Sequence, residues 1–224
     1  MKKIVVLTGA GISAESGIST FRDANGLWEN HDIMEVASIS GYYKNPQLVQ
    51  EFYNKRRQQL FDVYPNRAHL FLKELEQYFN ITIITQNVDD LHERAKSSHI
   101  IHLHGELRKA RSEQNENIII DWDKDIKIGD KAADGNQLRP HIVWFGEMVP
   151  MMDSAINEVK TADILLVVGT SMQVYPAASL IDYVKNNTQI IYIDPNDSFQ
   201  SNSIIHIKKK ATEAIDDIKK ILVL

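Results

Sequence analysis

Cysteine is missing from all 224 residues of the chain. Its absence excludes disulfide bridges, catalysis by a thiolate and any zinc site built from cysteine ligands. Long apolar runs are missing too, and without one the sequence predicts no membrane span. Positive charge is not in excess either, because the formal net charge is −5 and the isoelectric point is about 5.9. This balance disfavours general binding to nucleic acid.

We also expect no secretory leader at the start of the sequence. Met1-Lys2-Lys3 runs straight into an apolar stretch, and a cleavage site there would destroy the glycine-rich turn that follows. We therefore expect a cytoplasmic protein, and we expect it to be a monomer. With 43% hydrophobic residues, the chain is long enough for one sizeable core and a small inserted module.

Apolar strands alternate with amphipathic helices along most of the sequence. We expect strands over residues 3–8, 81–85, 99–103, 141–145, 164–168, 189–193 and 203–207, and helices over 46–63, 66–79, 151–161, 175–186 and 211–221. Such alternation predicts an α/β fold, a doubly wound parallel sheet with helices on both faces. Residues 106–140 are polar and contain several turn signals, so they predict a small excursion from the main sheet.

A glycine-rich turn follows the first predicted strand. Residues 9–13 (Gly-Ala-Gly-Ile-Ser) open a helix at this point, which is how α/β proteins cradle a pyrophosphate at a helix N-terminus. An ordinary dinucleotide-binding domain has a second strand about 20 residues later, ending in an acidic residue that binds ribose. Residues 21–34 contain turn signals instead. The sequence therefore departs from the pattern of a redox Rossmann enzyme.

Three further polar segments follow predicted strands. They are residues 86–89 (Gln-Asn-Val-Asp), His104-Gly105 and residues 169–171 (Gly-Thr-Ser). Because open parallel sheets bind ligands at the carboxyl ends of their strands, we expect these segments and the glycine-rich turn to form one site.

Two of these segments also fit other interpretations. Asn87 and Asp89 are typical of the residues that cap a helix N-terminus. His102 and His104 share one face of a strand, and such a pair fits a metal site, although no acidic residue is placed by the sequence to complete it. Buried, hydrogen-bonded imidazoles are a third interpretation, which fits His99 and His102.

Together, these motifs resemble the opening and the core motifs of the sirtuins, a family of NAD-consuming protein deacylases. The resemblance is carried by residues 9–13, by Phe-Arg-Asp at 21–23 and Gly-Leu-Trp at 26–28, and by Thr-Gln-Asn-Val-Asp at 85–89. It implies a single catalytic domain with a Rossmann-like NAD-binding part and a small module formed by two insertions. The implied NAD-binding part is 1–25, 65–105 and 140–224, and the implied module is 26–64 and 106–139.

The resemblance also implies a role for each matching residue. His104 is the implied catalytic residue, a general base that takes a proton from a ribose hydroxyl. The implied NAD-binding residues are Gly9, Ala10, Gly11, Ser13, Glu15, Phe21, Arg22, Gln86, Asn87, Asp89, Gly169, Thr170, Ser171, Asp194 and Ala211. Acyl-lysine protein or peptide substrates are implied to bind at Val143, Phe145, Gly146 and Glu147, along a strand edge that pairs with an extended peptide.

Tyr53 and Arg56 lie one turn apart on the predicted helix 46–63 and share a face. Taken alone, they fit an aromatic ring packed inward and a solvated arginine. Their segment resembles that of the sirtuin subclass that removes negatively charged acyl groups. The resemblance implies that both residues bind the distal carboxylate of succinyl- or malonyl-lysine, for which an arginine fork is suited.

The segment after His104 departs from the family pattern. Most sirtuins hold a structural zinc there through two Cys-x-x-Cys pairs, whereas this chain has no cysteine. We therefore expect no zinc and no other metal, and a small hairpin that is docked on the large domain and has apolar residues available for packing. We also expect Arg108 and Arg111 to pair with nearby acids such as Asp121 and Asp125.

The function implied is NAD-dependent removal of acyl groups from protein lysines. The acyl group passes to ADP-ribose, nicotinamide is released, and succinyl- and malonyl-lysine are preferred over acetyl-lysine. An NAD-dependent ADP-ribosyltransferase or an NAD hydrolase would use the same pocket. A redox enzyme and a non-enzymatic NAD sensor are the remaining alternatives.

Overall fold

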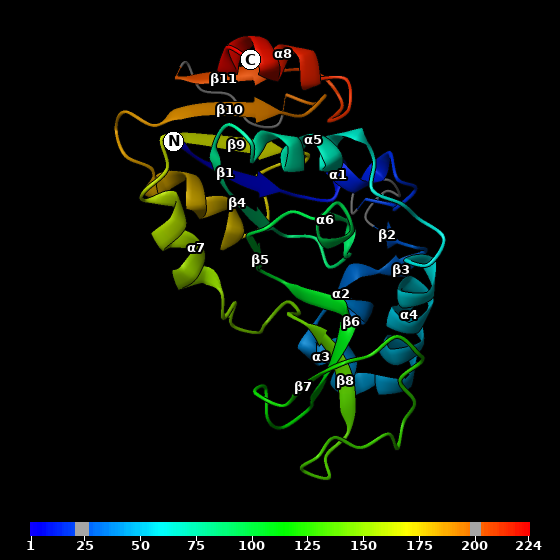
Figure 1. The fold of residues 1–224 in the computed structure, drawn as a ribbon. Helices are drawn as coiled ribbons and strands as arrows, with labels where there is room; N and C mark the ends of the chain where they lie inside the picture. The colour runs from blue at the N-terminus through cyan, green and yellow to red at the C-terminus, as the bar shows by residue number, and fades with distance from the viewer. Residues whose placement is uncertain (21–26, 198–202) are drawn as a thin grey trace.

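A computed structural model describes residues 1–20, 27–197 and 203–224 of the chain. Its main sheet contains β1 (Lys3–Thr8), β4 (Asn80–Thr85), β5 (Ile100–His102), β9 (Ile164–Val168), β10 (Gln189–Ile193) and β11 (Ile204–Ile207). These six strands are parallel and lie in the order β11-β10-β9-β1-β4-β5. Figure 1 shows this sheet at one end of the molecule and a smaller sheet at the other. The predicted doubly wound α/β fold is confirmed.

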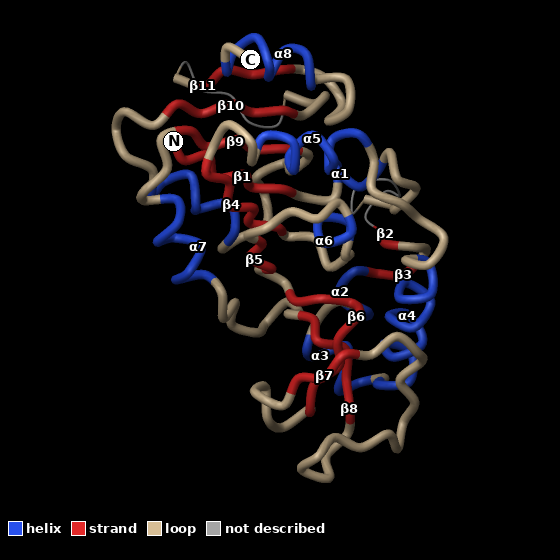
Figure 2. Tube along the Cα trace, viewed as in Figure 1, coloured by secondary structure: helices blue, strands red, loops and turns tan. Residues whose placement is uncertain are grey.

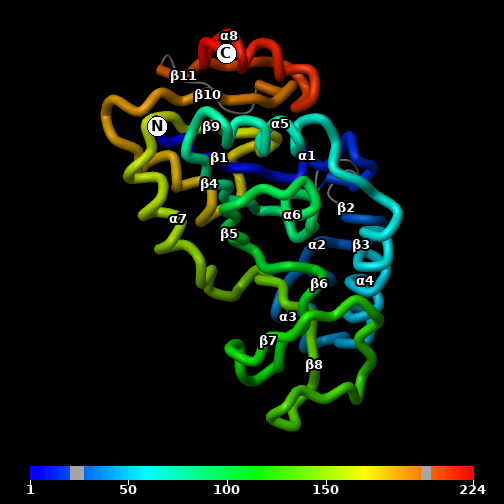
Figure 3. Tube along the Cα trace, in the orientation of Figure 1, coloured from blue at the N-terminus to red at the C-terminus, as the bar shows by residue number. Residues whose placement is uncertain are grey.

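The first strand lies inside the sheet, with later strands on both sides of it (Figure 3). Val6 of β1 lies opposite Ile83 of β4 and opposite Leu166 of β9. From β1 the chain builds outward through β4 to β5, and then returns to the other side of β1 to build β9, β10 and β11. The direction therefore reverses between β1 and β9, and in such sheets a crevice for ligands opens at this point.

Helices cover both faces of the main sheet. On one face lie α1 (Gly11–Ala14), α5 (Arg67–Leu75) and α8 (Ile215–Leu222), and on the other lie α7 (Met152–Val159) and the 3₁₀-helix η1 (Ala177–Tyr183). Leu72 and Ile218 pack in the first core, and Val159 and Leu180 pack in the second. Because both faces are covered, the strands carry apolar residues at successive positions rather than at alternate ones.

The second sheet has three antiparallel strands, β6 (Gly105–Ser112), β7 (Ile119–Asp121) and β8 (Leu138–Ile142). We expected a strand over 141–145 within the alternating part of the chain, and this expectation is wrong. The strand runs over 138–142 and pairs with β6, which leaves the main sheet directly after His104. Residues 143–146 follow it as an extended segment and turn, in which the Phe145 N–H donates to the Ala37 carbonyl over 2.8 Å.

Helices from the first part of the chain pack against the smaller sheet (Figure 2). They are α2 (Ile33–Val36), α3 (Ile39–Lys44) and α4 (Pro46–Gln59), preceded by a hairpin of β2 (Leu27–Trp28) and β3 (His31–Asp32), whereas α6 (Leu91–Arg94) follows β4. Asn45 caps α4 by accepting from the Leu48 N–H over 3.2 Å, and Pro46 occupies its first turn. The helix ends at Gln59, four residues before the predicted end.

The other predicted helices differ from the structure mainly at their ends. The segment expected as a helix over 175–186 forms η1, a 3₁₀-helix that begins after Pro176. Such tight turns are common in short connections. Among the described residues, no helix combines the length and the apolar character that crossing a membrane requires.

Ion pairs and a small apolar core stabilise the segment 105–142, in which most sirtuins have zinc-binding cysteines. Ile126 and Leu138 are buried in this core. The predicted partners of the two arginines are wrong. Arg108 pairs with Asp123 and Asp90 over 2.8 and 3.1 Å, because the strand register places Asp121 opposite Lys109 instead.

Arg111 contributes to a partly buried cluster around Glu147. The carboxylate of Glu147 accepts two hydrogen bonds from Arg139, over 2.6 and 3.0 Å, one from Arg111 over 3.1 Å and one from the Trp144 N–H over 2.8 Å. Burial alone would raise the pKa of Glu147, but the arginines and this N–H hold it below its ordinary value. The cluster ties β6 and β8 to the segment 143–147.

Glu147→Gln keeps the size of this side chain and removes its charge. We expect it to lower the free energy of unfolding by about 2 kcal/mol, because charge-assisted hydrogen bonds in a partly buried site are weakened together. The melting temperature would then fall by about 6 °C. Glu116→Gln is the matched control, because Glu116 lies 3.6 Å from Arg111 but its side chain is 68% exposed. A chelator is expected to leave the wild-type melting temperature unchanged, and unfolding by chelator would contradict a metal-free segment.

Candidate active site

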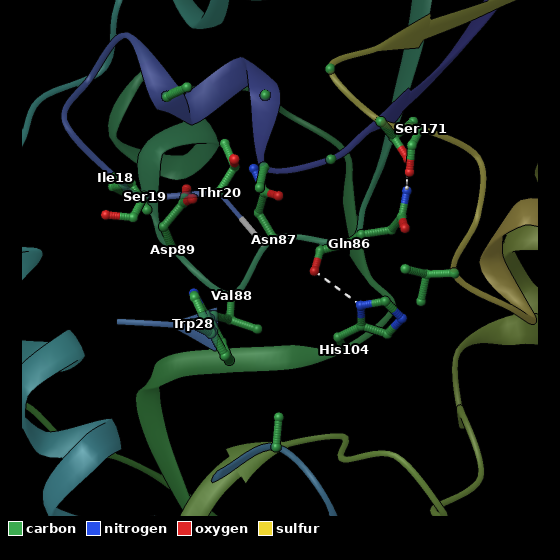
Figure 4. Close-up of a pocket in the computed structure, with 18 of the residues that line it drawn as sticks. Ile18, Ser19, Thr20, Trp28, Gln86, Asn87, Val88, Asp89, His104 and Ser171 are labelled. Carbon is green, nitrogen blue, oxygen red and sulfur yellow. Dashed lines mark hydrogen bonds between the residues drawn. The ribbon is translucent and has the colours of Figure 1, made fainter. Parts of the chain in front are cut away.

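A cavity of about 610 Å³ opens at the carboxyl ends of β1, β4 and β9, where the strand order reverses. Four predicted segments line it: the glycine-rich turn, residues 86–89, His104 and residues 169–171. Every predicted site residue that the structure describes lines this cavity except Ser13, which lies buried behind it. Phe21 and Arg22 lie outside the described residues. Figure 4 shows Gln86, Asn87, Asp89 and His104 around this space.

The glycines of two segments meet at the floor of the cavity. The Gly9 N–H donates to the Val168 carbonyl over 3.1 Å, and the Gly11 N–H donates to the Gly169 carbonyl over 2.8 Å. A Cβ atom on Gly11 would lie 2.6 Å from the Cα of Gly169, which is closer than real Cβ contacts allow. Only residues without side chains let these two turns approach so closely.

Gly169→Ala tests this close approach. The residue has φ +64°, and a Cβ atom there would lie close to the backbone of Ile12 and Gly11. We expect the substitution to lower the free energy of unfolding by about 2 kcal/mol, from backbone strain and from the clash. Gly135→Ala is the matched control, because Gly135 has φ +80° with nothing within 4 Å of the added Cβ. Chemical denaturation measures the free energy of unfolding of both variants. Equal losses in Gly169→Ala and Gly135→Ala would contradict a role for the close approach.

A buried hydrogen-bond network orients Asn87 and Asp89. The Ser13 hydroxyl donates to Asp89 Oδ2 over 2.9 Å and accepts from Asn87 Nδ2 over 3.1 Å. His69 lies behind Ser13, with Nε2 3.4 Å from its hydroxyl oxygen. Because the backbone N–H of Asn66 points at Nδ1 of His69 over 3.3 Å, Nε2 carries the proton and donates to Ser13. The helix-cap interpretation of this run is also met in part, because Asp89 accepts from the Leu91 N–H.

Burial changes the acid–base properties of this network. It raises the pKa of Asp89, although the hydrogen bonds from Leu91 and Ser13 oppose the shift. It lowers the pKa of His69 to about 4, so this imidazole is neutral at pH 7. At neutral pH His69 therefore holds a single ring proton, and the donation from its Nε2 to Ser13 follows from that.

His104 presents one ring nitrogen as a base. Its Nδ1 lies 3.0 Å from the backbone carbonyl of Gln86, and the dashed line in Figure 4 marks this contact. Because a carbonyl oxygen accepts only, Nδ1 carries the ring proton and Nε2 holds the lone pair. Burial lowers the pKa of His104, and the hydrogen bond to Gln86 opposes the shift in part. The ring is therefore neutral at pH 7 and able to accept a proton.

At the other end of the cavity, two strand ends and α1 are joined by polar contacts. Gln86 Nε2 donates to the Thr170 hydroxyl over 3.1 Å. The carboxylate of Glu15 accepts from the backbone N–H and the hydroxyl of Thr212, over 3.1 and 2.7 Å. This contact holds Ala211 beside the glycine-rich turn. Asp194 is buried and accepts from the Asn196 N–H over 2.9 Å.

Arg56 is buried, and the solvated interpretation of this residue is wrong. Its side chain is 7% exposed and its guanidinium lies over the Trp28 ring, 4.2 Å from the centroid. Its Nε and Nη1 have no hydrogen-bond partner within the described part of the chain. Tyr53 is buried beside it, and both residues line the cavity. An arginine with unpartnered donors in a cavity wall is suited to bind an anion.

The segment 143–147 borders the same cavity. Val143 and Phe145 line it, and the backbone of Val143 donates to the His104 carbonyl over 2.9 Å. The carboxylate of Glu147 is held by Arg139, Arg111 and the backbone of Trp144, so it fixes the shape of this segment from within. The predicted role of Glu147 in substrate binding stays a prediction.

Several lining residues were not predicted as site residues, among them Trp28, Leu107, Ile142, Trp144 and Tyr175. Leu107 and Ile142 come from β6 and β8, and Trp28 comes from the hairpin β2–β3. The sequence gives no spacing signal that links these segments to the glycine-rich turn. The Gly-Leu-Trp motif was the one available pointer to Trp28.

His99 and His102, the other two histidines of the segment before Gly105, differ in their surroundings. His99 is exposed, so its interpretation as a buried histidine is wrong, whereas His102 is hydrogen-bonded to Glu93 over 2.6 Å. Burial lowers the pKa of His102, but the Glu93 carboxylate raises it above its ordinary value overall. The structure also brings Glu106 near His102, which the sequence did not place there. Since Glu106 pairs with Lys109 over 2.8 Å, these charges are already balanced and we assign no metal to them.

Comparison with known proteins gives the family. A model of the Sir2 family matches residues 9–176. The chain is 57% identical over 220 residues to an NAD-dependent protein deacylase of Helicobacter pylori, covering 97% of this chain and 96% of the relative. It is 53% identical over 231 residues to a protein of the same description from Bacteroides thetaiotaomicron, covering 100% and 99%.

Solved structures agree with these relatives. A mutant Sir2 homologue in complex with ADP-ribose matches with a TM-score of 0.90 at 42% identity, covering 100% of this chain and 94% of that one. A Sir2 homologue in complex with NAD matches with a TM-score of 0.87 at 41% identity, covering 99% and 90%. A Sir2 protein bound to an acetylated peptide matches with a TM-score of 0.81 at 26% identity, covering 98% and 93%. The chain belongs to the Sir2 family, the family of the sirtuins.

Proposed function

We propose that this chain is an NAD-dependent protein-lysine deacylase that transfers the acyl group to ADP-ribose, and that it prefers succinyl- and malonyl-lysine to acetyl-lysine. The observation that carries the activity is the position of His104, a neutral imidazole in the wall of the cavity that the glycine-rich turn and residues 86–89 also line. The names of relatives at 57% and 53% identity support the same activity.

The residues of the cavity fit NAD. Gly9, Gly11 and Gly169 form a floor without side chains, in which an added Cβ would clash and on which a phosphate can approach the backbone closely. Asn87 uses its Nδ2 to donate to Ser13, which leaves its carbonyl oxygen for the carboxamide of nicotinamide. Asp194 offers carboxylate oxygens to ribose hydroxyls at the opposite end of the cavity.

The chain's own groups position the reactants and move one proton. NAD supplies a glycosidic bond whose cleavage releases nicotinamide and leaves an electrophilic ribose carbon. Val143 and Phe145 would border the acyl-lysine, and the open side of the cavity admits the water that releases free lysine and O-acyl-ADP-ribose. His104 accepts a proton at Nε2 from a ribose hydroxyl, while its Nδ1–H stays bonded to Gln86. Positioning and acid–base assistance together account for the rate enhancement we propose.

Arg56 carries the proposed acyl preference. Its guanidinium is buried in the cavity wall with donors that no described residue satisfies. A distal carboxylate on the acyl chain would supply charge-assisted hydrogen bonds to these donors. An acetyl group is too short and carries no charge, so it leaves them unsatisfied.

The test compares two peptides of identical sequence, one with acetyl-lysine and one with succinyl-lysine. Each is incubated with the protein and NAD, and mass spectrometry follows the free lysine, nicotinamide and O-acyl-ADP-ribose. We expect all three products, with a higher kcat/KM for succinyl-lysine. Nicotinamide release with ADP-ribose attached to protein would indicate a transferase instead. Release of nicotinamide and free ADP-ribose without deacylation would indicate an NAD hydrolase.

A further inference from the structure

Arg56 has an acidic neighbour within the chain. Glu29 Oε1 lies 3.8 Å from Arg56 Nη1, which is within ion-pair distance but too long for a hydrogen bond. The two side chains differ greatly in exposure, 7% for Arg56 and 39% for Glu29. The cation is therefore fixed in the cavity wall, whereas the carboxylate is free to turn into solvent.

The hairpin β2–β3 delivers both the ring and the carboxylate to Arg56. Trp28 pairs with His31, so Glu29 and Asn30 form a two-residue turn between the strands. Both turn residues have positive φ, +49° and +67°, which is the backbone of the tight turns that suit hairpins. The turn holds the backbone of Glu29 next to Trp28, whose ring covers the guanidinium.

We propose that Glu29 is a specificity-determining residue, an internal and displaceable counter-ion of Arg56. The inference rests on the proposed function, in which the acyl chain reaches Arg56. A buried cation without a partner is unfavourable. When a neutral acyl group occupies the cavity, Glu29 remains beside Arg56 and offsets this cost. When the acyl chain carries its own carboxylate, that carboxylate replaces Glu29 and forms the hydrogen bonds that Glu29 is too distant to form.

Glu29 therefore has opposite effects on the two substrate classes. It lowers the KM for neutral acyl groups, because such a group displaces water from the cavity around Arg56 and Glu29 is then the partner that remains. It raises the KM for negatively charged acyl groups, because they must displace it. The chemical step is the same for both substrates, so kcat is expected to change little.

The test measures KM and kcat of Glu29→Gln on the acetyl- and succinyl-lysine peptides. We expect the KM for succinyl-lysine to fall about threefold and the KM for acetyl-lysine to rise about threefold. Effects of this size are expected because a partly exposed ion pair is weak. The preference for succinyl-lysine would then rise about tenfold. Glu35→Gln is the matched control, because it removes the same charge from an exposed position on α2 and is expected to change neither KM.

Two further variants keep the inference falsifiable. Glu29→Asn suits a backbone with positive φ, so it preserves the turn and is expected to act in the same direction as Glu29→Gln. In an Arg56→Met background, Glu29→Gln is expected to leave the preference unchanged, because the counter-ion then has no cation to pair with.

The outcomes separate the inference from the proposed function. Suppose that the wild type shows no preference for succinyl-lysine and that Arg56→Met changes kcat/KM for neither peptide. That result would contradict the proposed acyl preference and, with it, the proposed role of Glu29. If the wild type and Arg56→Met behave as proposed but both Glu29 variants keep the wild-type preference, the inference about Glu29 alone is overturned.

Discussion

Replacing His104 with alanine is expected to lower the rate of deacylation about 10³-fold while NAD affinity stays within about twofold of the wild type. The expectation follows from the geometry of the ring. Its Nδ1 proton is fixed on the Gln86 carbonyl, so Nε2 is the nitrogen that accepts a proton. The floor that would hold the phosphates of NAD comes from glycines on other segments. Removing the imidazole therefore removes the base and leaves the binding surface.

The measurement is single-turnover deacylation together with direct titration of NAD. His99→Ala is the matched control, because His99 is exposed and lies outside the cavity lining. Stability of both variants is followed by thermal unfolding. Deacylation within tenfold of the wild type in His104→Ala, with normal folding, would remove His104 from its proposed role.

The pH dependence gives an independent test of the same residue. Burial lowers the pKa of His104 below its ordinary value near 6.5. The neutral ring is the active form, so kcat/KM is expected to fall as the pH decreases through this pKa. The acid limb of the profile should therefore have its midpoint below pH 6.5. A midpoint above 6.5 would contradict a buried imidazole without a charged partner as the base.

The parallel sheet could be predicted because its strands carry a complete local signal. Residues 3–8, 164–168 and 189–193 are short, apolar and bounded by polar turns, and each is found as a strand within one residue. Strands buried on both faces need no partner information to be recognised. The glycine-rich turn and the residues that follow β4 and β9 could also be placed together, since parallel strands end at the same edge of the sheet.

The position of β8 could not be predicted because it depends on a partner strand. Residues 138–142 include Arg139 and Pro140, which weaken the local strand signal, whereas 141–145 are more apolar. Pairing with β6 decides the outcome, and the register shift between Glu106 and Ala110 is not visible in the sequence. Antiparallel pairs of this kind are selected by tertiary contacts more than by propensity.

The surroundings of Arg56 could not be predicted for a similar reason. Helical spacing placed Tyr53 and Arg56 on one face, but it did not show whether that face is covered. Trp28, from a two-residue strand, covers the guanidinium. Burial by a segment distant in sequence depends on the tertiary structure, so it could not be predicted from helical spacing. Because Trp28 covers Arg56, this helix position becomes a candidate anion site.

Arg56→Met is expected to lower kcat/KM for succinyl-lysine about 100-fold while kcat/KM for acetyl-lysine changes about threefold or less. Methionine keeps the unbranched apolar stem of the side chain, and it removes the guanidinium with every donor. Hydrogen bonds to charged groups contribute roughly 1.5–3 kcal/mol, which matches a loss of this size. The loss is expected in KM more than in kcat, because the carboxylate lies at the far end of the acyl chain from the reacting carbonyl.

Two further variants separate binding of the carboxylate from effects of charge and folding. Lys55→Met removes the same charge from an exposed position on α4. It is expected to leave kcat/KM unchanged for both peptides. Arg56→Lys keeps the charge without the planar fork, so it is expected to retain part of the succinyl preference. Equal losses for both peptides in Arg56→Met, with a lowered melting temperature, would show that Arg56 supports the fold of this wall. An unchanged preference in a stably folded Arg56→Met would show that the acyl carboxylate binds elsewhere.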